Sequence, residues 1–138
     1  MWSSLENKKV VLGVTGSIAC YKAVQLASQM VQSGAIVHVI MTKSATQFVS
    51  PLTFRSITHN QVVTDLFDLD SEHAIEHVSL ANEADVLVIA PATANFIAKL
   101  ANGISDDSLS ITALATSAPI LVTPAMDANM FNNEAFQN

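Results

Sequence analysis

The sequence has few of the residue types that mark disulfide-bonded or nucleic-acid-binding proteins. Its 138 residues include one cysteine, Cys20, which excludes an internal disulfide and is typical of a reducing compartment. Six Lys and Arg stand against twelve Asp and Glu, giving a net charge of −6. Because a nucleic-acid surface needs clustered basic side chains to neutralise phosphates, this composition argues against nucleic acid as a partner.

Long apolar runs are also missing. No stretch approaches the roughly 20 residues that span a bilayer, and the N-terminal MWSSLENKK lacks the apolar centre of a signal peptide. Half of the residues are nevertheless apolar, which is enough for one domain with a packed core. We therefore predict a soluble, cytoplasmic protein with one domain over residues 1–138 and no membrane partner.

Glycine is scarce as well, and its placement excludes two common nucleotide-binding motifs. The first glycine-containing turn, GVTGSI, contains Gly13 and Gly16. It matches neither the dinucleotide motif G-x-G-x-x-G nor the triphosphate motif G-x-x-x-x-G-K-[ST]. A mononucleotide cofactor is therefore favoured over a dinucleotide or a triphosphate.

What the sequence does contain is a regular alternation of strand and helix patterns. Short, continuous apolar runs indicate strands buried on both faces, and the segments between them show helical spacing. The pattern predicts a doubly wound parallel α/β sheet, Rossmann-like with flavodoxin-type layers, and an acidic loop at 68–76. Strands are expected at 10–14, 35–41, 61–67 (the weakest), 84–90 and 119–123, and helices at 18–33, within 42–50, at 52–57, 95–101 and 106–116.

Polar clusters follow these strands. They read TGSIA, MTKSA, PATANF and PAMDANM, and PATANF places Pro91, Thr93 and Asn95 where a simple turn would not need them. In doubly wound sheets ligands bind beyond the carboxyl ends of the strands, near the point where the strand order reverses. Hydroxyls, small side chains and helix N-termini at this edge suit a phosphate attached to a flat heterocycle.

Three separated segments resemble a known family. GVTGSIACYK, EHVSLANEADVLVIAPATANFIAKLANGISDDSLS and TPAMDANMF are similar to the homo-oligomeric flavin-containing cysteine decarboxylases, in particular to the phosphopantothenoylcysteine decarboxylase domain of the bifunctional coenzyme A biosynthesis protein. The similarity extends in order over essentially the whole chain. It implies FMN as cofactor and no metal. The residues that the resemblance places around FMN are Gly16, Ser17, Ile18, Thr42, Ser44, Thr93, Ala94, Asn95, Phe96 and Ala125.

The resemblance also implies the chemistry. FMN would oxidise the thiol of the substrate's cysteine to a thioaldehyde, which stabilises the carbanion left by CO2 loss, and would then return the electrons to give 4′-phosphopantetheine. Of the four histidines, His38 is expected in a strand and His59 and His73 in polar connections. His77 matches the family's active-site histidine and is our candidate acid–base group.

Other functions remain open at this point. A peptidyl-cysteine decarboxylase would share the fold, the cofactor and His77, and a non-catalytic FMN-binding regulatory subunit is a third possibility. A flavin prenyltransferase fits PAMDANMF and His77 less well. The resemblance implies a homotrimer or larger homo-oligomer, for which Phe96, Met130 and Phe131 are candidate interface residues, although core packing explains them equally well.

Cys20 is expected to be a small buried core residue. A second cysteine of the family, on a mobile segment further along, is not present, so we expect these residues to be a fragment that lacks this segment.

Asp127 departs from the family pattern, in which Asn follows PAM and binds the substrate carboxylate. In its protonated form Asp127 could donate a hydrogen bond to the substrate carboxylate. Alternatively, Asp127 could turn away and leave Asn129 or backbone N–H groups to bind the carboxylate, or the true substrate could be a different one. We expect a working decarboxylase with Asp127 and Asn129 in the substrate site.

Overall fold

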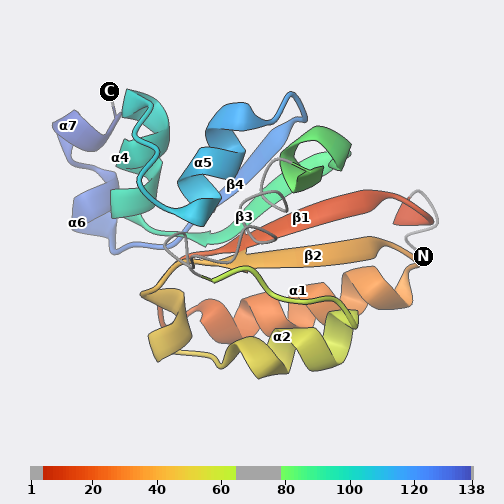
Figure 1. The fold of residues 1–138 in the computed structure, drawn as a ribbon. Helices are drawn as coiled ribbons and strands as arrows, with labels where there is room; N and C mark the ends of the chain where they lie inside the picture. The colour runs from red at the N-terminus through yellow and green to blue at the C-terminus, as the bar shows by residue number, and fades with distance from the viewer. Residues whose placement is uncertain (1–4, 65–78, 138) are drawn as a thin grey trace.

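The computed structural model describes residues 5–64 and 79–137, and these form a parallel sheet with helices on both faces. The strands are β1 (Lys9–Val14), β2 (Ile36–Met41), β3 (Val86–Ala92) and β4 (Ile120–Pro124), hydrogen-bonded in the order β2-β1-β3-β4. The chain leaves β1 toward β2 on one side and later returns to β3 on the other (Figure 1). The strand order therefore reverses between β1 and β3, which confirms the predicted doubly wound sheet.

The helices form one layer on each face of the sheet. Figure 1 shows α1 (Cys20–Gln32) and α2 (Pro51–Thr58) below it, and α4 (Ala94–Asn102) and α5 (Ser108–Ala115) above it. Shorter helical segments are η2 (Ala45–Gln47), residues 79–83, α6 (Ala128–Phe131) and α7 (Glu134–Gln137). Within residues 5–64 and 79–137, no helix has the length and apolar character needed to cross a membrane.

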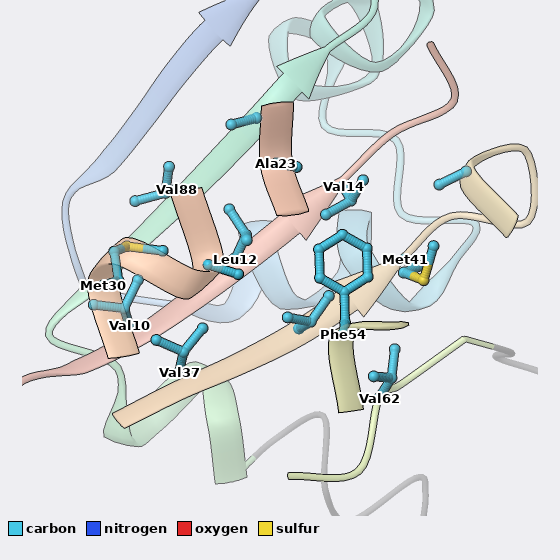
Figure 2. Close-up of a cluster of buried hydrophobic side chains, with 14 of the residues drawn as sticks. Val10, Leu12, Val14, Ala23, Met30, Val37, Met41, Phe54, Val62 and Val88 are labelled. Atoms are coloured by element: carbon cyan, nitrogen blue, oxygen red, sulfur yellow. The ribbon is translucent and has the colours of Figure 1, made fainter. Parts of the chain in front are cut away.

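Each face of the sheet has its own hydrophobic core, and this explains the continuous apolar strands. Val10, Leu12 and Val14 of β1 pack into the core between the sheet and the helices α1 and α2 (Figure 2). Val11 packs into the core on the opposite face, which α4 and α5 cover. Gly13 faces Leu109 of α5 so closely that an added Cβ would lie 2.4 Å from Leu109 Cδ1. Gly13 therefore lets α5 pack directly against β1.

The first helix begins two residues later than expected. Its buried face consists of small or unbranched residues, Cys20, Ala23, Ala27 and Met30. Ile18, in the turn before the helix, is 81% exposed and Tyr21 is 56% exposed, so these two apolar residues lie outside that face. Small side chains on this face let α1 lie close to the sheet, where larger ones would overpack.

The expected third strand at 61–67 is wrong for its described part. Residues 61–64 form a single parallel bridge, between Val63 and Ile40. Before it, the side-chain amide of Asn60 donates to Val37 O at 2.9 Å, so a side chain takes the place of a backbone ladder bond on the outer side of β2. Residues 65–67 and the expected acidic loop at 68–76 lie outside the described residues.

Candidate functional site

A buried threonine joins the turn after β1 to the end of β3. Thr15 is 1% exposed, and its Oγ1 donates to Pro91 O at 2.5 Å and accepts from Thr93 N at 3.0 Å. The turns on either side of the strand-order reversal are thus fixed to each other by hydrogen bonds shielded from water. Sequence reasoning missed Thr15. The available signal was a hydroxyl directly after a buried strand and before a glycine.

The turns after β1 and β2 lie in direct contact at Gly16. A Cβ added to Gly16 would lie 2.3 Å from Ser44 Cβ and 2.9 Å from the Ser44 carbonyl carbon. Glycine is required here because any larger residue would push the two turns apart. On the β2 side, Thr42 Oγ1 accepts from Ala45 N at 3.2 Å, which orders the turn that contains Ser44.

The PATANF stretch divides between a strand and a helix. β3 continues to Ala92, with an irregularity in its pairing to β4 between Ile89 and Ala92, so the expected strand end at Ala90 is wrong. The turn is Thr93, whose Oγ1 accepts from Phe96 N at 3.2 Å and caps α4. The polar residues of this stretch therefore begin a helix at the sheet edge, where its first N–H groups lack partners within the helix.

These three turns surround a cavity of about 320 Å³, which we call the three-turn cavity. Most of the residues that line it have polar side chains, and Lys43, Lys99 and Asp107 are charged. The residues that line it are Thr15, Gly16, Thr42, Lys43, Ser44, Thr93, Asn95, Phe96, Lys99 and Asp107.

Lys99 is held between two carboxylates at the edge of this cavity. Its Nζ lies 2.9 Å from Asp106 Oδ1 and 3.3 Å from Asp107 Oδ2. Burial lowers the pKa of Lys99, but the two carboxylates outweigh burial, and the net pKa is raised. The hydrogen bond from Lys99 lowers the pKa of Asp106. Asp107 also caps α5, its Oδ1 accepting from Ser110 N at 2.7 Å.

A second cavity, of about 660 Å³, lies between α1 and the residues that follow β4, and we call it the β4 cavity. Lys22 and Leu26, one turn apart on α1, and Ile18, in the turn before it, line one side of the cavity. Asp127 lies on the opposite wall and caps α6, its Oδ1 accepting from Met130 N at 2.8 Å. The lining is Ser17, Ile18, Ala19, Lys22, Ala23, Leu26, Ala90, Pro91, Thr123, Pro124, Ala125, Met126 and Asp127.

The predicted site residues divide between these cavities. Six of them line the three-turn cavity, namely Gly16, Thr42, Ser44, Thr93, Asn95 and Phe96. Four line the β4 cavity, namely Ser17, Ile18, Ala125 and Asp127. Ala94 is half-buried in the first turn of α4, and Asn129 is exposed on α6. His77 lies outside the described residues.

Three further predictions concern single residues. Phe96 is 2% exposed and belongs to the core, so it is not an exposed interface residue as proposed, whereas Met130 and Phe131 are exposed. Cys20 is fully buried, as expected; its Sγ donates to Thr15 O at 3.1 Å, and burial raises the pKa of its thiol. Among the described residues, no three His, Cys, Asp or Glu side chains are grouped as a metal site would require.

Comparison with known proteins finds relatives over nearly the whole chain. A family model described as Flavoprotein matches residues 2–138. The coenzyme A biosynthesis bifunctional protein CoaBC of Bacillus subtilis is 50% identical over 131 residues, which cover 95% of this chain and 32% of that protein. The Escherichia coli protein of the same name is 42% identical over 135 residues, covering 98% and 33%. The chain thus spans about a third of the length of these curated relatives.

Solved structures share the fold. The FMN-dependent cysteine decarboxylase SpaF superposes with a TM-score of 0.85 at 34% identity, covering 96% of this chain and 77% of that one. A PPC decarboxylase mutant complexed with pantothenoylaminoethenethiol superposes with a TM-score of 0.78 at 29% identity, covering 96% and 74%.

Proposed function

The chain belongs to the Flavoprotein family, and from that premise we propose that it binds FMN and decarboxylates 4′-phosphopantothenoylcysteine to 4′-phosphopantetheine in the cytoplasm. The observation that supports this best is the meeting of the turns after β1, β2 and β3 around the three-turn cavity, directly at the reversal of strand order. Open α/β sheets bind nucleotides at this position. The relatives in coenzyme A biosynthesis suggest the substrate.

The three-turn cavity fits the phosphate end of FMN. Gly16 has no Cβ, which lets the turn containing Ser44 lie against it, and both residues line the cavity. Thr42, Ser44 and Thr93 supply hydroxyls, and the start of α4 supplies N–H groups. We propose that these residues hold the phosphate and ribityl chain, with Gly16, Ala94, Asn95 and Phe96 shaping the turns.

The β4 cavity fits the flavin ring and the substrate. Ile18, Leu26 and Met126 give it apolar walls that would exclude water, which suits a flat ring and strengthens electrostatic contacts inside. Ser17, Ile18 and Ala125 would contact the ring region of FMN, and Asp127 and Asn129 the substrate. When bound, FMN supplies an acceptor for two electrons from the substrate thiol and later returns them, so that decarboxylation is redox-neutral overall.

His77 is proposed to move the proton during thiol oxidation. A neutral imidazole can accept or relay a proton near pH 7. The variant His77→Asn should purify as a yellow, FMN-loaded protein that releases no CO2 from 4′-phosphopantothenoylcysteine. Unimpaired turnover by this variant would eliminate the role.

The proposed function is tested by a spectrum and an assay on the same preparation. The purified protein should show the two visible absorption bands of an oxidised flavin, and heat-released flavin should be FMN. The full-length protein should convert 4′-phosphopantothenoylcysteine to 4′-phosphopantetheine with release of one CO2. Absence of flavin would reject the proposal, and FMN without CO2 release would favour the non-catalytic flavin-binding subunit.

A peptidyl-cysteine decarboxylase is the second candidate. Two solved FMN-dependent cysteine decarboxylases, SpaF and TvaF from thioviridamide biosynthesis, superpose with TM-scores of 0.85 and 0.86, above the 0.78 of PPC decarboxylase. Parallel assays with 4′-phosphopantothenoylcysteine and with a peptide that ends in cysteine separate the two. Turnover of the peptide alone would make this candidate the function.

We further propose that the chain assembles as a homotrimer or a larger homo-oligomer. Ile18 on the wall of the β4 cavity and Met130 and Phe131 on α6 are large apolar side chains exposed near the site, as expected of a shared interface. Sedimentation of the FMN-bound protein should give at least three times the chain mass. A stable FMN-bound monomer would contradict it.

A further inference from the structure

The three-turn cavity has a fixed negative charge in its wall. Asp107 caps α5, with Oδ1 accepting from Ser110 N at 2.7 Å while the Ser110 hydroxyl accepts from Asp107 N at 3.0 Å. This reciprocal capping box holds the carboxylate where the cavity and the helix meet. A phosphate entering the cavity would therefore meet a like charge that cannot turn away without uncapping α5.

Lys99 offsets that charge from within the same cavity. Its side chain is only 20% exposed, and its Nζ lies 3.3 Å from Asp107 Oδ2 and 2.9 Å from Asp106 Oδ1. Lys99 and Asp107 line the cavity, whereas Asp106 belongs to neither the three-turn nor the β4 lining and has an exposed side chain. A cavity of about 320 Å³ is roughly one screening length, about 8 Å, across, so a phosphate inside it would feel both charges.

We propose that Lys99 offsets the charge of Asp107 in the wall of the three-turn cavity, where Lys43 is the third charged lining residue, and that Lys99 is a specificity-determining residue for a phosphorylated flavin over an unphosphorylated one. This inference rests on the proposed binding of FMN. Lys99 has a positioning role, because it acts through Asp107. Hydroxyls and N–H groups bind the phosphate, and Lys99 removes the repulsion that Asp107 would otherwise exert on it.

The test compares FMN with riboflavin, which differ by the phosphate. Flavin fluorescence gives the Kd of each for the apoprotein of wild type and variants. Lys99→Met keeps the length of the side chain but leaves Asp107 unneutralised. The FMN Kd should rise about tenfold and the riboflavin Kd by less than about twofold, because Coulomb repulsion acts on the phosphate alone. The rise should shrink in high salt.

Asp107→Asn tests the other half of the pair. Asparagine also caps helices well, so α5 should remain intact while the repulsive charge is lost. FMN should bind about two- to threefold more tightly and riboflavin as before.

The double variant Lys99→Met with Asp107→Asn should return the FMN Kd to within about threefold of wild type. Asp106→Asn is the matched control, since it removes a partner of Lys99 outside the cavity, and its ratio of the two Kd values should stay within about twofold of wild type.

Several outcomes would overturn the inference. Equal weakening of FMN and riboflavin by Lys99→Met, or no recovery in the double variant, would show that Lys99 only joins α4 to α5. If Lys99→Met does not fold, Asp107→Asn decides, and an unchanged FMN-to-riboflavin ratio would reject the role. If wild type binds neither flavin, the proposed function fails and this inference with it; FMN binding without the predicted ratios would leave the proposed function standing.

Discussion

The two cavities beside the carboxyl ends of the strands are built in different ways. The three-turn cavity lies where turns are fixed to one another: buried Thr15 hydrogen-bonds two turns together, and Gly16 lets the turn containing Ser44 come into contact. The β4 cavity is twice as large, and its lining includes the exposed Ile18 and Asp127. A cavity fixed by contacts between turns suits a group that never varies, such as a cofactor phosphate, whereas exposed side chains in a wall can be substituted to change the substrate.

Disrupting the contact between Gly16 and Ser44 should have the largest effect, which is on FMN affinity. In Gly16→Ala the new Cβ would overlap Ser44 Cβ and the Ser44 carbonyl carbon, and overpacking of this kind costs about 1–3 kcal/mol. We expect FMN affinity to fall about 10- to 100-fold, measured by flavin fluorescence on the apoprotein.

A second variant controls for this change. Adding Ser44→Gly to Gly16→Ala removes the Cβ–Cβ overlap and should recover part of the affinity. If Gly16→Ala alone binds FMN normally, the close contact does not shape the cavity.

Removing the buried hydroxyl of Thr15 should have the next largest effect. Thr15→Val keeps the shape of the side chain but leaves Pro91 O without its hydroxyl donor and Thr93 N without an acceptor, at a cost of about 2–3 kcal/mol. Urea unfolding should show this loss in the free energy of unfolding. Thr15→Ser retains the hydroxyl and should lose less than about half as much; equal losses would mean that the methyl group, and not the hydrogen bonds, matters.

In the β4 cavity, substitution of Asp127 should lower the free energy of unfolding by less than Thr15→Val does, and should act specifically on activity. Asp127→Ala loses the cap of α6, worth about 1 kcal/mol, and is expected to abolish decarboxylation while FMN stays bound. Asp127→Asn can still cap the helix and should retain activity. Full activity of the alanine variant would show that Asp127 does not bind substrate, and loss of FMN would show that the two cavities are not separable.

The smallest expected effect is that of the Lys99–Asp106 ion pair on the free energy of unfolding in acid. Lys99 lowers the pKa of Asp106 in the folded state below the ordinary Asp pKa of 3.8. The pair therefore stabilises the fold at pH values above 3.8, and this stabilisation is lost as the pH falls through the lower folded-state pKa. In urea unfolding across a pH series, wild type should exceed Asp106→Asn by a small constant amount near neutral pH. The difference should shrink as the pH falls below 3.8 and vanish only below the lower pKa that Asp106 has in the folded state. A difference that persists in acid would mean that the pair does not act through charge.

Parts of this fold follow directly from local sequence patterns. Continuous apolar runs predicted β1, β2 and β3, because strands buried on both faces have no polar side to alternate with, and a similar run predicted β4, although most of β4 is exposed. Helical spacing predicted the helix at 106–116, which is α5 in the structure, with Asp107 in the capping geometry. In both cases the deciding interactions lie within a few residues along the chain.

Other parts needed the three-dimensional structure. The helical spacing of 18–33 predicted α1 but not its buried face, which consists of Cys20, Ala23, Ala27 and Met30, while Ile18 and Tyr21 are exposed. The weak strand at 61–67 is a single bridge in its described part, since Asn60 takes over one bond to β2. The sequence left Phe96 open between an interface and the core, and it lies in the core, because α4 turns that side of its first helical turn toward the sheet.

The layered parallel architecture, the sheet edge with the polar turns and the family follow from the sequence, because strand periodicity and motifs are local properties. The contacts that join Thr15 to the end of β3, Gly16 to Ser44, and Lys99 to Asp107 became evident in the folded chain alone. Thr15 and Pro91 are 76 residues apart in the chain. Which groups meet over such a separation depends on strand order and helix packing, which no short stretch of sequence contains.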